Sequence, residues 1–213
     1  PVDLQQTPAD MVVLSFSDSD LGAFSVGWHN AKEGLPSLRL ANLAALQHPL
    51  SVDTYIEQTL CYAKAVLVRL IGGMPYWAYG LQQLRAIAEE NGIALAVLAA
   101  DGRADSQLDE ISTLPISTLR RLRQLCDAGG PDAASTALAQ LALSAGLFAR
   151  PKIGQKIPPR VGGWSLQNRL SCPAAFALRV APKPAVVISF YLSYLTAADL
   201  APIEAAAKAL EAR

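Results

Sequence analysis

The stretch AKAVLVRLIGGMPYWAYGLQQL, Ala63–Leu84, combines an apolar run, a glycine pair, an aromatic patch and the start of a helix. Val66–Ile71 is apolar on both alternating faces except at Arg69, as is typical of a central strand in a parallel sheet that helices cover on both sides. Gly72 and Gly73 then interrupt the strand pattern. This stretch therefore predicts a buried strand, a glycine turn and a helix in succession.

The helix of this unit is predicted from apolar residues at helical spacing, which are Trp77, Leu81, Leu84 and Ala88. Asn91 and Gly92 are suited to end it. In open α/β sheets, ligands bind beside the turns at the carboxyl ends of the strands. We therefore expect any functional crevice to lie beside Gly72–Tyr76.

Three further stretches predict strands of the same sheet, Met11–Phe16, Ser37–Leu43 and Ile93–Ala99. Helices are expected between them, one at Leu21–Asn30, weakened by its glycines, and one after Ser51 as an N-cap. Strands and helices that alternate with short connections predict a parallel sheet with right-handed crossovers. The expected fold class is α/β, a doubly wound parallel sheet with flavodoxin-like strand order.

Two more helices are predicted to follow the sheet as a helical hairpin. Ser117 is a candidate N-cap for the first helix, and Pro131 suits the first position of the second. The first helix carries three basic residues, Arg120, Arg121 and Arg123. Such a trio can bind phosphate or an acidic partner, whereas a solvated helix face is the commoner explanation.

The composition changes over residues 150–184, where prolines, glycines and basic residues predict a linker or crossing segment. Residues 1–149 are accordingly expected to form the head domain. Ala185–Tyr191 predicts a fifth strand and Ala198–Ala212 a helix. Because one strand and one helix are too few for a domain, residues 185–213 are expected to begin a second α/β domain.

The composition limits the classes of protein that the chain can represent. With 52% apolar and 17% charged residues the chain can bury a full core, and eighteen basic residues balance eighteen acidic ones. No overall charge favours nucleic acid or an anionic membrane, and no apolar run is long enough to span a bilayer. Cys61, Cys126 and Cys172 form no metal-binding or disulfide pattern, as expected in a reducing, cytoplasmic compartment. The start at Pro1 and the helix that ends at Arg213 suggest an excerpt of a longer protein.

The sequence contains no strong catalytic pattern. It lacks the GxxxxGK[ST] phosphate loop, the HExxH and GxSxG motifs, and GxGxxG after a strand. His29 and His48 are the only histidines and lie in different predicted loops, so neither alone supports a metal site. The residues by themselves indicate a fold and a crevice, but no catalytic or metal-binding residue and no reaction.

Several long stretches carry a family resemblance: TPADMVVLSFSDSDL (Thr7–Leu21), LPSLRLANLAALQHPLSVDTYIEQTL (Leu35–Leu60) and the stretch Ala63–Leu84. The most specific part is RLIGGMPYWAYG, Arg69–Gly80. These stretches resemble the N-terminal region of the large subunit of aerobic cobaltochelatase, the CobN type, a family related to the large subunit of magnesium chelatase. Gly129–Ala142 and Ala185–Arg213 are similar to the segments that follow in the same order.

The resemblance implies part of an ATP-dependent ligase that inserts cobalt(II) into hydrogenobyrinic acid a,c-diamide, a corrin, in cobalamin biosynthesis. Two smaller AAA+ type partner subunits would use ATP and Mg, and the remainder of the large subunit would hold most of the corrin and metal site. Stripping water from a metal and distorting a macrocycle are both uphill, so conformational work must be coupled to binding. This chain is then expected to shape the corrin cavity or to dock partners.

The candidate substrate contacts lie near the predicted carboxyl edge of the sheet: Asp18, Asn42, Arg69, Gly72, Gly73, Tyr76 and Trp77. An aromatic patch can stack on a flat macrocycle, and an arginine can bind carboxylates. The aromatic residues can equally anchor their helix in the core. Arg69 needs partners if it is buried, and Asp18 or Asp101 are the expected ones.

Two hypotheses from different classes remain open at this point. The first is the chelatase head, a part of an enzyme that is not catalytic alone. The second is a free-standing flavodoxin-like module that binds a small ligand or anchors an assembly. The strand and helix predicted after residue 184 favour the first hypothesis.

Overall fold

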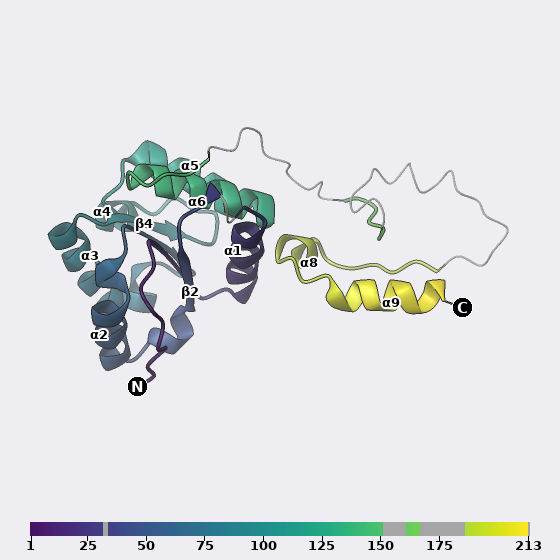
Figure 1. The fold of residues 1–213 in the computed structure, drawn as a ribbon, viewed down its shortest axis with the longest axis horizontal. Coiled ribbons are helices and arrows are strands. Elements are labelled where there is room, and N and C mark those ends of the chain that lie inside the picture. The colour runs from purple at the N-terminus through teal and green to yellow at the C-terminus, as the bar shows by residue number, and fades with distance from the viewer. Residues whose placement is uncertain (32–33, 151–160, 167–185, 213) are drawn as a thin grey trace.

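The structure is a computed structural model that describes residues 1–31, 34–150, 161–166 and 186–212. Its centre is a sheet of four strands in the order β2-β1-β3-β4 (Figure 1). The strands are β1 Met11–Ser15, β2 Leu38–Asn42, β3 Ala65–Leu70 and β4 Ala94–Ala99. All neighbouring pairs run parallel. The predicted α/β class with flavodoxin-like strand order is therefore confirmed.

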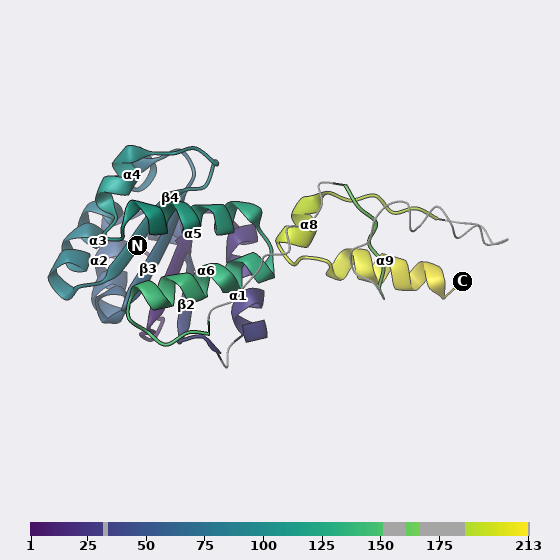
Figure 2. The ribbon, with the colours of Figure 1, turned by 90° about the horizontal axis from the view of Figure 1, so that it is seen from above.

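Helices cover both faces of the sheet. One face carries α1 Asp18–Ala31, α5 Ile116–Ala128 and α6 Pro131–Ser144. The other carries α2 Pro49–Gln58, α3 Ala78–Asn91 and α4 Ser106–Ile111. The helices α5 and α6 form the predicted hairpin (Figure 2), whereas α4 was not predicted. None of the described helices is long and apolar enough to cross a membrane.

The alternation of side chains along the strands builds two core layers. In β3, Val66 and Val68 pack toward α2 and α3, while Ala65 and Leu67 pack toward α1, α5 and α6. Every residue of β3 is buried, as expected for a central strand. Arg69 takes the next position on the α1, α5 and α6 side, so its guanidinium enters an otherwise apolar layer.

The outer edge of β4 is closed by two residues that follow α4. The N–H of Thr113 donates to the Leu95 carbonyl at 2.9 Å, and the Ser112 hydroxyl accepts the N–H of Val97 at 2.9 Å. These bonds occupy main-chain groups that would otherwise attract another strand. They also return the chain to the amino-terminal half of β4, so α5 begins there and runs in the strand direction toward the carboxyl edge.

Two predicted helix caps are wrong. The side chain of His48, not Ser51, caps α2 by accepting the N–H of Leu50. The helix α5 begins at Ile116, before the predicted cap Ser117. In both cases the chain enters the helix through a proline, whose fixed φ favours the first helical turn and moves the start upstream.

The segment 186–212 lies outside the sheet. Residues 186–191 form no strand, which corrects the strand predicted at Ala185–Tyr191; α8 Leu192–Thr196 and α9 Ala201–Glu211 follow. A strand requires a neighbouring strand, and the described sheet does not pair with this segment. In Figures 1 and 2, α8 lies next to α1 and α9 extends away from the sheet. Most of the predicted linker at 150–184, with its basic residues, lies outside the described residues.

The helices α1 and α6 approach each other closely at Gly27. A Cβ atom on Gly27 would lie 2.5 Å from the carbonyl oxygen of Pro131 and 3.0 Å from the amide nitrogen of Ser135. Glycine lowers the helix propensity of α1, yet it permits this approach. The stability of α1 therefore comes from packing rather than from its sequence propensity.

Gly27→Ala is expected to lower the free energy of unfolding by about 2 kcal/mol, because the added Cβ overpacks the contact between α1 and α6. Asn30→Ala, at an exposed position of the same helix, is the matched control, with an expected change below about 0.5 kcal/mol. Urea denaturation followed by circular dichroism measures both values. Equally small effects of the two substitutions would contradict the close approach.

Candidate functional site

The carboxyl edge of the sheet is the candidate site, because polar and glycine-rich turns meet there. The strand β1 leads into α1 on one face, whereas β3 leads through Gly72 and Gly73 toward α3 on the other. Neighbouring strands whose helices leave to opposite faces form a topological switch point, where ligands bind in folds of this kind. The turns after β1 and β3 therefore define the site.

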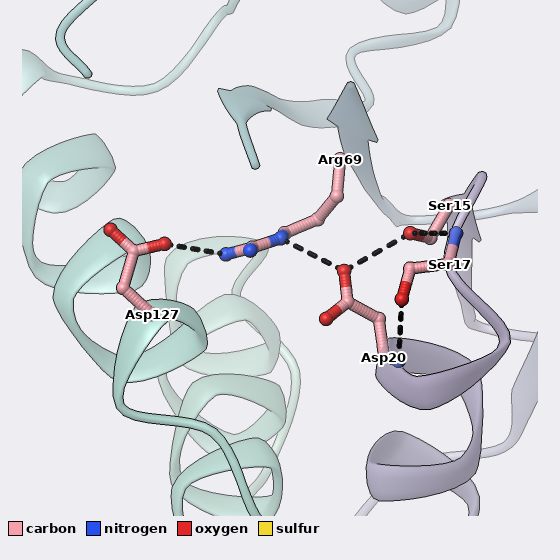
Figure 3. A network of polar contacts seen from close by, with 5 residues as sticks. All are labelled: Ser15, Ser17, Asp20, Arg69 and Asp127. Carbon is pink, nitrogen blue, oxygen red and sulfur yellow. Dashed lines mark hydrogen bonds and ion pairs between the residues drawn. The ribbon is translucent and has the colours of Figure 1, made fainter. Parts of the chain in front are cut away.

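Arg69 is the central residue of this edge (Figure 3). It is only 4% exposed. Its Nε donates to Oδ2 of Asp20 at 3.1 Å, and its Nη1 donates to Oδ1 of Asp127 at 3.1 Å. The same Asp20 oxygen accepts the hydroxyl of Ser15 at 3.1 Å. The guanidinium thus joins β3 to the start of α1 and to the end of α5.

We expected Arg69 to pair with Asp18 or Asp101, and this prediction is wrong. Ser17 caps α1 by accepting the N–H of Asp20 at 3.2 Å, so the Asp20 carboxylate is not needed as a cap and faces Arg69. Asp101 lies in the turn after β4, where it approaches a different arginine. Asp20 is the partner of Arg69 because it lies three residues after the cap. At that position of the helix its side chain points back over the sheet.

The charges around Arg69 compensate for its burial. Burial alone would lower the pKa of Arg69, but Cys126, Asp20 and Asp127 outweigh it and place the pKa above its ordinary value. The dipole of α5 acts in the same direction, because the guanidinium lies at its negative end, while the dipole of α1 stabilises the ionised Asp20 at its positive end. Arg69 therefore stays charged, and its Nε and Nη1 groups hold these elements together.

Cys126 lies beside the same guanidinium on the last turn of α5. Burial raises the pKa of its thiol from 9.0 to about 11, although the charge of Arg69 acts in the opposite direction. Thiolates are the reactive form of cysteine, so a raised pKa makes this thiol unreactive at neutral pH. Cys126 is therefore a structural member of the Arg69 network.

Asp18 and Asn42 lie together on the exposed side of the edge. Asn42 is the last residue of β2, and its side-chain N–H donates to Oδ1 of Asp18 at 2.7 Å. Its own Oδ1 accepts the N–H of Ala44 at 2.9 Å, which fixes the orientation of the amide. Asp18 is exposed, so its carboxylate retains free acceptor positions.

The turn after β3 places two glycines and a tyrosine at the same edge. Gly72 and Gly73 have φ values of 85° and 79°, in the left-handed region that glycine adopts readily. A Cβ on Gly72 would lie 2.2 Å from the Tyr76 ring, so this ring lies directly against the turn. Tyr76 is 64% exposed. The edge therefore presents exposed main-chain groups beside an accessible aromatic ring.

Trp77 does not belong to this accessible surface, which supports the alternative that it anchors its helix in the core. It is 4% exposed, and its Nε1 donates to the Leu46 carbonyl at 2.8 Å. The ring packs in the core layer under α2 and α3. Helical spacing places Trp77 on the inward face of its helix, so its role is to anchor that helix in the core. Tyr76 is then the aromatic residue of this turn that can stack on a ligand.

Asp127 and Cys126 were not among the predicted site residues. Asp127 is 58 positions from Arg69 in the sequence, and only the direction of α5 brings the two together. One signal was present in the sequence. An acidic residue just before the glycines that end a helix is unfavourable for the helix dipole, which indicates a cationic partner elsewhere in the fold.

The histidines have local roles. Nδ1 of His29 lies 2.9 Å from the Ser25 carbonyl, and His48 caps α2. Across the described ranges, no group of three or more His, Cys, Asp or Glu side chains is arranged to hold a metal ion.

Comparison with known proteins identifies relatives along nearly the whole chain. The CobN subunit of aerobic cobaltochelatase from a Sinorhizobium species is 33% identical over 224 residues, which cover 99% of this chain. The CobN subunit from Pseudomonas aeruginosa is 33% identical over 211 residues, or 93% of this chain. The chain is homologous to a segment of CobN. It spans 17% and 16% of the lengths of these two relatives.

A solved structure shares the fold of the chain. The catalytic subunit of cobaltochelatase from Mycobacterium tuberculosis superposes with a TM-score of 0.63 over 94% of this chain and 15% of that chain. At 21% sequence identity, this similarity concerns the fold. No protein-family model matches the chain. The resemblance to CobN that the sequence indicated is confirmed by the curated relatives.

Arg69→Met is expected to lower the free energy of unfolding by about 3 kcal/mol, because Asp20 and Asp127 lose a buried cationic partner. The exposed Arg121→Met is the control, with an expected change within about 0.5 kcal/mol. Urea denaturation measures both. In an Asp127→Ala background the cost of Arg69→Met should be smaller, and a cost that stays unchanged would show that the two residues are not coupled.

Cys126 is expected to react with iodoacetamide at about pH 8 at least tenfold more slowly in the folded chain than in urea. Labelling is slowed because the pKa of about 11 lies above the ordinary 9.0, so the folded chain favours the neutral thiol. This contribution to the stability of the fold is lost as the pH rises through the pKa of the folded chain. Peptide mass spectrometry on a Cys172→Ser variant measures the labelling, with Cys61, which has the same intermediate exposure but lies away from Arg69, as the internal control. Equal labelling of Cys126 in the folded and unfolded chains would contradict the raised pKa of its thiol.

Proposed function

We propose that this chain forms part of the large subunit of an aerobic cobaltochelatase, which inserts cobalt(II) into a corrin ring in cobalamin biosynthesis. The match to two CobN proteins along 99% and 93% of the chain carries this proposal. The substrates are cobalt(II) and hydrogenobyrinic acid a,c-diamide. This assignment is favoured over a free-standing binding module, because both relatives are far longer than the matched segment.

Cobalt insertion requires work, which we assign to two smaller AAA+ type subunits that hydrolyse ATP with Mg²⁺. A hydrated metal ion must lose water and a macrocycle must distort before the new bonds form. Closing motions of protein domains are a means of coupling such steps to an energy source. In this division, the large subunit binds the corrin and the partner subunits drive the conformational change.

The carboxyl edge of the sheet is proposed as part of the wall of the corrin cavity. The exposed Tyr76 ring suits the apolar face of a macrocycle. The carboxylate of Asp18 and the amide of Asn42 suit the amide and acid groups at its rim, and the main chain of Gly72 and Gly73 allows close approach. Arg69, whose Nε and Nη1 are bonded to Asp20 and Asp127, acts in this proposal as a positioning residue rather than a ligand contact.

Residues 185–213 are proposed to begin a following domain of the same subunit, joined to the head at 1–149 through 150–184. The support is apolar exposure: Val186, Val187 and Tyr191 are 65%, 88% and 81% exposed. Clusters of exposed apolar side chains usually mark contact surfaces. We assign the remainder of the large subunit as the part that covers them.

Binding of hydrogenobyrinic acid a,c-diamide to the 213-residue chain, measured by isothermal titration calorimetry, tests the placement of the corrin. Tyr76→Ala is expected to raise the Kd by about five- to tenfold, because a stacking contact of about 1 kcal/mol or more is lost. Tyr62→Ala is the matched control, since Tyr62 is 61% exposed but precedes β3 at the opposite edge of the sheet.

Saturable binding that Tyr76→Ala weakens and Tyr62→Ala leaves unchanged supports the proposed cavity wall. Circular dichroism establishes that each variant is folded. A folded chain that does not bind the corrin, or equal effects of the two substitutions, would remove the ring from this edge and leave the chain a scaffold or docking role.

A further inference from the structure

The last turn of α8 lies against two helical elements of the candidate site (Figure 2). The N–H of Gly130 donates to the carbonyl of Thr196 at 3.1 Å. A Cβ atom on Gly129 would lie 3.0 Å from the Cβ of Thr196. A Cβ atom on Gly22 would lie 3.0 Å from the carbonyl oxygen of Ala197. The turn therefore contacts the start of α1 and the end of α5 at glycines, which permit a close approach.

The contacted glycines closely follow the two carboxylates that bind Arg69. Gly22 comes two positions after Asp20, and Gly129 comes two positions after Asp127. Each of these carboxylates lies 3.1 Å from the Arg69 guanidinium. Two separate contacts, one through Arg69 and one through the last turn of α8, therefore join the start of α1 to the end of α5.

The backbone at the end of α8 has a conformation that its sequence does not favour. The N–H of Asp199 donates to the Tyr194 carbonyl at 2.9 Å. The N–H of Ala198 donates to the Leu195 carbonyl at 3.2 Å, which completes a Schellman motif. Glycine is usual at the left-handed position of this motif, yet Ala198 occupies it with a φ of 59°. Such a conformation persists where the surroundings determine it, and the contacts of the turn with α1 and α5 do so here.

We propose that the last turn of α8 positions the candidate site, by holding the start of α1 and the end of α5 in place around Arg69. The segments that this turn contacts carry both carboxylate partners of Arg69, so displacement of the turn loosens the Arg69 contacts. Loss of Arg69 loosens the turn in return, because the coupling between two sites acts in both directions. Thr196 and Ala197 act through these elements and are positioning residues, not ligand contacts.

The start of α1 connects this turn to the accessible groups of the candidate site. Asp18 is the first residue of α1, and it accepts the side-chain N–H of Asn42 at 2.7 Å. A shift of the start of α1 therefore moves the Asp18 carboxylate relative to Asn42. The segment 192–212 thereby gives movements of the residues around α8 and α9 a route to the carboxyl edge. The inference does not depend on the corrin proposal, because it concerns contacts within the chain.

Hydrogen exchange of the Gly130 amide, followed by NMR in the 213-residue chain, tests the contact, because this N–H bonds directly to α8. Gly22→Leu is expected to speed this exchange about tenfold or more, since the added side chain displaces the Ala197 carbonyl while leucine favours the helix α1. Asn30→Leu, at an exposed position of the same helix, is the matched control, with an expected change below about twofold. Circular dichroism establishes that each variant is folded.

Arg69→Met tests the coupling to the site, and it is expected to speed exchange of the Gly130 amide about tenfold or more. Leu84→Ala, in the core layer on the other face of the sheet, also lowers stability and is the matched control, with an expected change below about twofold. The proposal is overturned if Arg69→Met and Leu84→Ala speed this exchange equally, or if Gly22→Leu leaves it unchanged.

Ala198→Gly supplies a variant of opposite sign that does not alter α1 or α5. Glycine removes the conformational cost of the left-handed position, so the docked turn becomes more stable. Exchange of the Gly130 amide is expected to slow about two- to fivefold. Unchanged or faster exchange in Ala198→Gly would overturn the role of this turn.

Discussion

The guanidinium of Arg69 constrains the whole carboxyl edge of this structure. It stands in an apolar layer with 4% exposure, so its charge must be compensated by partners that are themselves held in place. Asp20 at the start of α1 and Asp127 at the end of α5 supply that compensation from two different helices. The strand β3 is hydrogen-bonded to a strand on each side. The contacts of Arg69 therefore fix the positions of both helices relative to the centre of the sheet. Buried ion pairs of this kind contribute more to positional specificity than to net stability, and the Arg69 network fits that role.

The same constraint decides which groups remain for a ligand. An arginine near the carboxyl end of a strand suggests carboxylate recognition, yet here Nε and Nη1 bind carboxylates of the chain itself. The accessible groups lie around it: Asp18 with Asn42 at the end of β2, and Tyr76 against the Gly72 turn. The Arg69 network thus holds the elements of the candidate site in place, while the accessible groups beside it are a carboxylate, an amide, main-chain groups and an aromatic ring.

The short helix α4 explains the other features of α5. The chain crosses from one face of the sheet to the other past the edge of β4, where Ser112 and Thr113 bond its main chain. As a result α5 runs in the direction of the strands, with its leucines in the core and its last turn on Arg69. One helix therefore serves both the core and the candidate site.

The sequence by itself determined the sheet, because a strand buried on both faces requires a continuous apolar run and each such run is followed by a turn and a helix. It also determined the glycine turn after β3 and the inward place of Trp77, since both depend on local spacing. Ser51 and Ser117 failed as caps because neighbouring prolines set the helix starts. Tertiary structure alone decided the partners of Arg69 and the absence of a strand at 186–191. The direction of a helix, and whether a strand finds a neighbour, depend on contacts between segments far apart in the chain, which no local pattern encodes.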